Sequence, residues 1–217
     1  MYKRLVGTKV KFTFFVALLL IVAALLTRIT GTKPVAGGPV QNSISLVSHS
    51  PLGGPNARDE YLTLNVIPSG GNAISLTGIR ISDGKIEITL GSGVALFEQG
   101  QINAQTPIVI TRASNIVISS GRSPLGVSFR ENKCTGLLST FQEFTLPLTP
   151  ACADCVEKKE GYPDYNACVK DHMSDSDFFG DLWRIYIGSD ETLWHDKFAV
   201  LRLYDTNNKL IALLPIR

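Results

Sequence analysis

Short alternations of apolar and polar residues dominate the chain beyond residue 42. In residues 60–67 (EYLTLNVI), leucine and valine side chains recur at every second position. Residues 86–90 repeat this pattern directly after Asp83-Gly84, a pair that favours a tight hairpin turn. The alternation predicts strands with one buried face and one solvated face, as in antiparallel sheets.

Similar short apolar runs follow one another, separated by turn-forming residues about every 8–12 positions. They predict further strands at residues 43–48, 74–81 (with a bend at Thr77-Gly78), 94–97, 107–111, 115–119, 126–130, 183–187, 198–204 and 209–214. The last two flank residues 206–208, where an Asn can adopt the left-handed turn of a hairpin. This spacing is typical of a sandwich of antiparallel sheets.

Residues 131–181 break the alternation and contain all four cysteines. Behind Pro163, one face of a short helix is predicted at i, i+3, i+4 and i+7 by Tyr165, Cys168, Val169 and His172. A further helical turn is predicted over residues 175–179. We expect disulfides to fasten this insertion to the sheets.

An uncharged apolar run, residues 12–27 (FTFFVALLLIVAALLT), precedes every predicted strand and follows Lys3, Arg4, Lys9 and Lys11. A cleaved signal peptide and a retained signal anchor both have this pattern. No small-residue cleavage site directly follows the run, which favours retention. The basic flank predicts a cytoplasmic N-terminus and an exported C-terminal part.

The predicted organisation therefore has four parts. A basic cytoplasmic tail spans residues 1–11, and one transmembrane helix spans residues 12–29. A Gly- and Pro-rich linker follows at residues 30–42. The exported domain, residues 43–217, is expected to be an all-β sandwich that carries the insertion.

Composition supports an all-β class, and the net charge gives no indication of a highly charged partner. The chain has 19 Gly and 11 Pro, which punctuate short β-branched runs. The formal net charge is only +2. Part of the basic excess belongs to the N-terminal flank, so the overall charge does not indicate nucleic-acid binding.

Four cysteines in an exported domain predict two disulfides: Cys134, Cys152, Cys155 and Cys168. The alternative is a four-thiolate zinc site, suggested by Cys152-x-x-Cys155. A zinc signature usually has two such close pairs, and this chain has one. Of the three pairings, we expect Cys134–Cys152 with Cys155–Cys168.

Two stretches resemble the lamin tail domain family: residues 60–64 (EYLTL) and 74–83 (ISLTGIRISD). Residues 121–136 (GRSPLGVSFRENKCTG), 165–169 with His172, 178–179 and 183–186 resemble membrane-anchored bacterial versions of it. Ile79 stands where the family usually has an aromatic residue. Over about residues 43–217, the resemblance implies an immunoglobulin-like β-sandwich that serves as an interaction module without catalytic residues.

The sequence shows no legible catalytic centre and predicts no cofactor. His49, His172 and His195 are scattered, and oxidised cysteines leave no free thiol for a Cys–His pair. Residues 119–123 (SSGRS) lack the G-x-S-x-G pattern of a nucleophile elbow. We therefore expect a protein that is not an enzyme.

Three groups of side chains are candidates for binding. Carboxylates that suit calcium, although not in an EF-hand spacing, are Asp171, Asp175, Asp177 and Asp181. A basic patch for an acidic polymer or DNA could form from Arg112, Arg122 and Arg130, or these arginines pair locally, for instance with Glu131. Aromatic residues that belong to the core, or to a sugar-stacking platform if exposed, are Trp183, Trp194, Tyr186 and Tyr204.

These observations favour a membrane-anchored extracytoplasmic binding or structural module in adhesion or envelope scaffolding. Its partners would be the membrane, through the N-terminal helix, and a protein or envelope-polymer ligand. One alternative is an enzyme, or an accessory domain of one, that acts on envelope polymer. Another is an exported nucleic-acid-binding module.

Overall fold

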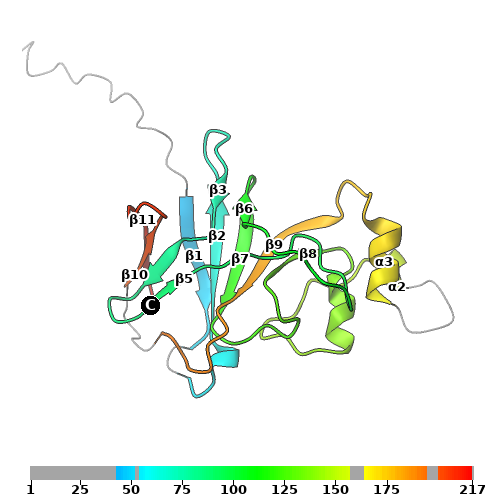
Figure 1. Ribbon diagram of the computed structural model, residues 1–217, viewed down its shortest axis with the longest axis horizontal. Coiled ribbons are helices and arrows are strands. Elements are labelled where there is room, and N and C mark those ends of the chain that lie inside the picture. The colour runs from blue at the N-terminus through cyan, green and yellow to red at the C-terminus, as the bar shows by residue number, and fades with distance from the viewer. Residues whose placement is uncertain (1–42, 52–53, 157–163, 195–199, 217) are drawn as a thin grey trace, which may run out of the picture. The chain divides into compact units, whose positions relative to one another are not determined.

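The computed structural model describes residues 43–51, 54–156, 164–194 and 200–216 (Figure 1). The predicted tail, transmembrane helix and linker lie outside these ranges, as do Pro163 and His195. Among the described helices, none has the length and apolarity that a membrane crossing requires. Residues Asn42–Arg217 form one compact unit.

The larger sheet has five strands in the order β1-β2-β7-β9-β8. Their bounds are β1 Ser43–His49, β2 Tyr61–Ile67, β7 Ser114–Ser119, β8 Phe129–Asn132 and β9 Phe179–Tyr186. Neighbouring strands are antiparallel except β7 and β9, which are parallel. The 3-10 helix η1, Ala57–Asp59, precedes β2.

Two smaller sheets complete the strand-rich unit. One has the order β11-β10-β4-β5, and the other pairs β3 with β6. Their bounds are β3 Ile74–Ser75, β4 Arg80–Ser82, β5 Glu87–Thr89, β6 Val109–Ile110, β10 Val200–Tyr204 and β11 Leu210–Pro215. With few helices beside these strands, the chain has the all-β class that the alternation predicted.

One hydrophobic core joins the sheets. Burial alternates along β2, with Leu62, Leu64 and Val66 buried and their neighbours less so. These side chains share a cluster with Ile81 of β4 and Leu203 of β10. Each sheet thus covers the apolar face of another.

The predicted turns are confirmed. At the β4–β5 turn, Gly84 has φ 94, and the Asp83 carboxylate accepts hydrogen bonds from the N–H groups of Lys85 and Ile86, each at 2.8 Å. Asn208 has φ 64 in the β10–β11 turn. At the predicted bend between β3 and β4, Gly78 has φ 87. Such positive φ values favour Gly and Asn.

The insertion has its own small core. It contains η2 (Thr135–Thr140), α2 (Ala153–Val156) and α3 (Tyr165–His172). The predicted helix face is confirmed, because Tyr165, Cys168 and Val169 are buried in a second cluster with Phe129 and Phe178. The predicted helical turn over residues 175–179 is reduced to a single hydrogen-bonded turn, in which the N–H of Phe178 donates to the carbonyl of Asp175 at 3.1 Å, because β9 begins at Phe179 and pairs with β8.

A buried ion pair links β8 and β9 to the segment that covers them. Glu131 and Arg184 each expose 2% of their side chain, and Arg184 Nε lies 2.5 Å from Glu131 Oε1. The other two guanidinium nitrogens donate to the carbonyls of Leu146 and Pro147 at 2.8 and 2.7 Å. Glu131 Oε2 accepts from the N–H of Thr149 at 3.0 Å. Every charged atom therefore has a partner, as a buried pair requires.

Replacing Arg184 with Met should lower the free energy of unfolding by about 3–5 kcal/mol, because Glu131 would remain as an unpaired buried charge. Urea unfolding followed by tryptophan fluorescence measures the change. Arg122→Met is the matched control, since Arg122 forms an exposed pair with Asp190 and its loss should leave the midpoint unchanged. Equal effects of the two substitutions would contradict the proposed contribution of the buried pair to the free energy of unfolding.

Burial raises the pKa of Tyr165 and of Tyr186 to about 12. Each phenol thus holds its proton more tightly in the folded than in the unfolded chain, where the pKa is about 10. Their contribution to stability is complete below about pH 10 and is lost as the pH rises toward 12. An absorbance titration of tyrosinate should show two of the six tyrosines ionising only near pH 12. Ionisation of all six near pH 10 would contradict this.

Candidate functional site

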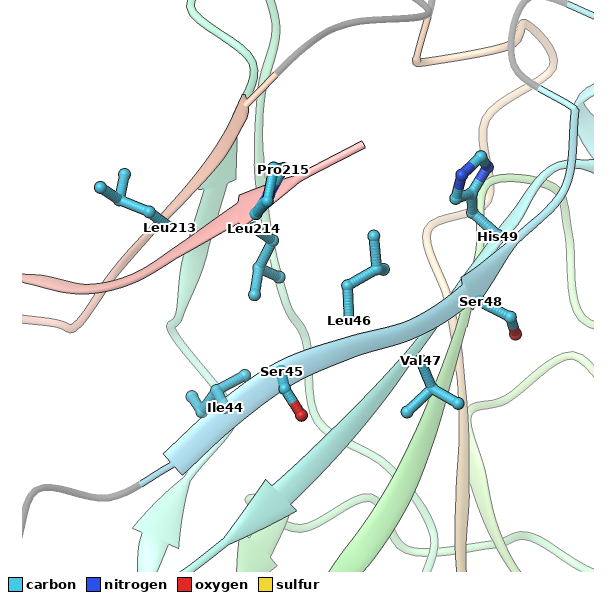
Figure 2. Close-up of a pocket in the computed structure, with 9 residues that line it drawn as sticks. All are labelled: Ile44, Ser45, Leu46, Val47, Ser48, His49, Leu213, Leu214 and Pro215. Atoms are coloured by element: carbon cyan, nitrogen blue, oxygen red, sulfur yellow. The ribbon is translucent and has the colours of Figure 1, made fainter. Parts of the chain in front are cut away.

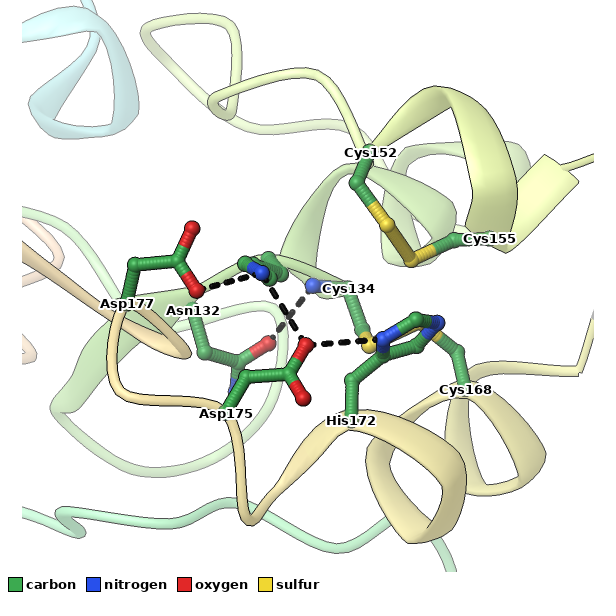
Figure 3. Close-up of polar contacts among 9 residues, drawn as sticks. Asn132, Cys134, Cys152, Cys155, Cys168, His172, Asp175 and Asp177 are labelled. Atoms are coloured by element: carbon green, nitrogen blue, oxygen red, sulfur yellow. Dashed lines mark hydrogen bonds and ion pairs between the residues drawn. A yellow bond between two sulfur atoms is a disulfide. The ribbon is translucent and has the colours of Figure 1, made fainter.

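All four cysteines form disulfides, as predicted, but the expected pairing is wrong. The bonds are Cys134–Cys168 and Cys152–Cys155 (Figure 3). The N–H of Cys155 donates to the carbonyl of Cys152 at 3.0 Å, so the chain turns and brings the two Cα atoms within 5.2 Å. This turn lets the close pair bond to each other, which leaves Cys134 to pair with Cys168 of α3. Both bonds lie within residues 131–181, so the expectation that disulfides fasten the insertion to the sheets is wrong.

The four candidate calcium ligands are not brought together. Asp175 and Asp177 converge on the ammonium of Lys133, with Oδ–Nζ distances of 3.0 and 2.5 Å. Hydrogen bonds from Lys133 and His172 lower the pKa of Asp175. Asp181 instead pairs with Arg112. An ammonium thus already lies where two of the carboxylates meet. The fourth candidate, Asp171, is exposed on α3.

The three candidate arginines divide between the two ends of β7. Arg112 and Arg130 lie at one end, where they donate to the carbonyls of Phe179 and Gly180, each at 3.0 Å. Burial and the nearby Arg112 lower the pKa of Arg130, whose guanidinium lies 4.9 Å from the centre of the Phe179 ring. The chain therefore builds a two-arginine cluster here.

Arg122, the third arginine, follows the other end of β7. It forms a two-bond pair with Asp190, at 3.0 and 2.8 Å, and both side chains are exposed. The pair lies beside two shallow hollows of about 410 and 320 Å³. Gly and Ser form most of the lining of the first, whereas Asn56, Arg58 and Pro124 help to line the second. The local ion pairs that the sequence allowed as an alternative are therefore present. Glu131 belongs to Arg184 rather than to any of these arginines.

Most of the aromatic residues considered for a sugar-stacking platform are buried. Trp183 and Trp194 expose 6% and 1% and belong to the main core, so neither presents a ring to a sugar. Tyr186 stacks on Phe129 in the second core, with ring centroids 6.3 Å apart. Tyr204 is partly exposed, and Arg80 lies over its ring at 5.3 Å.

A second buried carboxylate, Glu60, was not singled out from the sequence. It accepts hydrogen bonds from the Ser120 hydroxyl and from the backbone N–H groups of Leu193 and Trp194. Its position just before an apolar strand gives no signal of this role. Glu60 and Glu131 are each committed to internal donors, and neither lines the hollows described above or the groove described next.

The main candidate for a binding site is a groove of about 720 Å³ between β1 and β11 (Figure 2). Residues 44–49 of β1 line one side, and Leu213, Leu214 and Pro215 line the other. Leu46 and Leu214 point into the space between the strands, whereas Val47 and Leu213 point away from it. The lining contains no Asp, Glu, Lys or Arg.

Both walls of this groove are sheet edges. Within the described ranges, β1 pairs only with β2, and β11 pairs only with β10. In an edge strand, alternate N–H and C=O groups point away from the rest of the sheet. Two such edges face each other across an apolar floor, because Ile44, Leu46 and Leu214 pack against the main core.

A cluster of sulfur and nitrogen atoms lies in the insertion. Cys134, Cys155 and Cys168 have Sγ atoms within 4.8 Å of one another, and Cys152, Cys155 and His172 form a second such group. These are the described residues that could hold a soft metal ion if the cysteines were reduced. In the oxidised chain, the sulfurs are bonded to each other.

The comparisons with known proteins add no relative. No family model matches the sequence, and no curated protein is significantly similar to it.

Millimolar calcium should leave the thermal midpoint of the protein unchanged relative to a chelator, because Lys133 already neutralises Asp175 and Asp177. Differential scanning fluorimetry checks this. In Lys133→Met, the two carboxylates would face each other without a cation, so calcium should raise the midpoint of that variant. A calcium-dependent rise in the unsubstituted protein would contradict this assignment.

Proposed function

We propose that this chain is a binding module that takes an extended, uncharged polypeptide segment into the groove between β1 and β11. The observation that carries the proposal is the pair of open sheet edges across one groove. A segment laid in the groove can hydrogen-bond to one of these edges, β1 or β11. Such strand addition takes its affinity from main-chain hydrogen bonds and its specificity from pockets for alternate side chains.

The lining defines the chemistry of the segment. Because the groove lining contains no Asp, Glu, Lys or Arg, a charged side chain entering it would lose water without gaining a counter-charge. Ile44, Leu46 and Leu214 offer apolar contact at the floor. The preferred occupant therefore has small or apolar residues at alternate positions on the side that faces the floor.

The setting of the module is also a proposal. Two sheets that share one core, with strands spaced at regular intervals, support an immunoglobulin-like sandwich of the lamin tail type. The apolar run at residues 12–27 with its basic flank supports a membrane anchor. Two disulfides suit an oxidising compartment. The module would then act outside the membrane in adhesion or envelope scaffolding.

The geometry favours binding over the two alternatives. Each candidate arginine already has a carboxylate or carbonyl partner, which weakens the case for a nucleic-acid surface. The two buried carboxylates are saturated by internal donors, which weakens the case for an enzyme that acts on envelope polymer.

Selection of a display library of random linear peptides on the full-length protein in detergent micelles should enrich uncharged sequences with alternating apolar residues. Leu46→Lys places a charge in the groove and should weaken binding of an enriched peptide by at least about tenfold. Ile67→Lys is the matched control, since that side chain is 45% exposed and does not line the groove, and it should bind as before. Fluorescence anisotropy of the labelled peptide measures the affinities.

Methylation of the peptide's backbone nitrogens provides the second test. If the peptide adds as a strand, methyl groups on one set of alternate residues should abolish binding, while those on the other set should be tolerated. Equal effects on both sets would overturn strand addition. Undiminished binding to Leu46→Lys, or no enrichment over protein-free micelles, would overturn the groove as the site.

A further inference from the structure

Two disulfides meet where the insertion joins β8 (Figure 3). The N–H of Cys152 donates to the carbonyl of Lys133 at 3.0 Å, which places the Cys152–Cys155 turn beside Cys134. The Sγ of Cys155 lies within 4.8 Å of both sulfurs of the Cys134–Cys168 bond. Cys155 is therefore the link between the two disulfides.

The two bonds differ in access and in what they constrain. Cys134 and Cys168 expose 0% and 5%, whereas Cys152 and Cys155 are partly exposed. The inner bond spans 34 positions and the outer one only 3. In the chain-entropy model, a shorter closed loop gives less stabilisation. A reductant in solution should therefore open the outer bond first.

A positioned imidazole lies at the outer bond. One ring nitrogen of His172 is within 4.8 Å of the sulfurs of Cys152 and Cys155. His172 Nδ1 is 3.0 Å from Asp175 Oδ2, and the same carboxylate oxygen is 3.0 Å from Lys133 Nζ. A carboxylate partner fixes the orientation of an imidazole. An imidazole beside a thiol can take its proton and so form the thiolate, which is the reactive species in disulfide exchange.

We propose that Cys152–Cys155 is a redox-active disulfide that exchanges with an external dithiol and passes the exchange to Cys134–Cys168 through Cys155. The expectation that oxidised cysteines leave no free thiol for a Cys–His pair does not exclude this exchange, because here the disulfide itself is the electrophile. The proposal is independent of the groove between β1 and β11.

The first step is a two-electron transfer. A thiolate of the external dithiol attacks one sulfur of Cys152–Cys155 and forms a mixed disulfide. Its second thiol then displaces the mixed bond, so that the dithiol becomes a disulfide and Cys152 and Cys155 become thiols. The two protons of the dithiol end on these two cysteines.

The second step transfers no net electrons. Cys155 gives its proton to His172 and attacks one sulfur of the Cys134–Cys168 bond. That bond breaks, a new disulfide to Cys155 forms, and the displaced sulfur takes the proton back from the imidazolium. Asp175 is a positioning residue, since it acts through His172.

Two single substitutions test the link as a matched pair in the full-length protein. Cys152→Ser leaves Cys155 as a free thiol beside the inner bond, and we expect Cys155 to be found in disulfides with Cys134 or Cys168. Cys155→Ser leaves Cys152 as the free thiol. In the unsubstituted protein Cys152 is grouped with Cys155 and His172 and not with the inner bond, so we expect Cys134–Cys168 to persist. Alkylation without reductant, followed by mass mapping of disulfides, distinguishes the two results.

The unsubstituted protein gives a check that needs no change in sequence. Partial reduction with dithiothreitol, followed by alkylation, should trap Cys155 bonded to Cys134 or Cys168. His172→Gln should slow that exchange by about tenfold near neutral pH, since one pKa unit changes the thiolate fraction by up to that factor. It should also move the pH profile of the rate upward, which a purely structural role would not do.

Three results would overturn the proposal. The first is an intact Cys134–Cys168 bond with a free Cys155 in Cys152→Ser. The second is reduction of the two bonds in the unsubstituted protein without any Cys155 rearrangement. The third is protein isolated with four free thiols and one equivalent of zinc, because the same sulfurs would then be a metal site.

Discussion

The buried ion pair of Glu131 with Arg184 is the constraint on which the second half of the structure depends. It joins β8 to β9 and holds the backbone of residues 146–149 against them. A charge pair with so little exposure is stable only when all its donors and acceptors are satisfied. The covering segment supplies those partners, so its path is fixed. Cys152 follows a few residues later and meets the end of β8 at Lys133.

The groove between β1 and β11 and the sulfur cluster of the insertion lie apart in the fold. The insertion, with its sulfur cluster, extends from β8 at one edge of the five-stranded sheet, whereas the groove lies along β1 at the other edge (Figure 1). Sheet order separates them, with β2, β7 and β9 between. Peptide binding at β1 and disulfide exchange in the insertion can therefore be tested without interference.

Much of the fold could be predicted because the signals are local. Leu62, Leu64 and Val66 alternate in sequence, and this alternation alone assigns them to one buried face. Asp83-Gly84 and Asn208 predict their turns because few residues adopt positive φ without strain. The groove between β1 and β11 was not predicted, since nothing in residues 44–49 indicates that β1 is an edge strand. Its position depends on the pairing of strands distant in sequence.

The sequence by itself determined most of the strands, the turns, the helix face of α3 and the oxidation of the cysteines, because each follows from side-chain period, backbone preference or composition. The strand predicted at residues 94–97 is wrong, since Val94 forms only a single bridge to Phe129. Tertiary structure alone decided which cysteines bond, which carboxylates meet a cation and, among the described strands, which lie at sheet edges. Those outcomes depend on distances between segments far apart in the chain. Asp175 and Asp177 are near in sequence to Asp181, yet Lys133 takes the first two and Arg112 the third. The packing of distant segments places Lys133 and Arg112 beside these carboxylates, and no local sequence pattern predicts that placement.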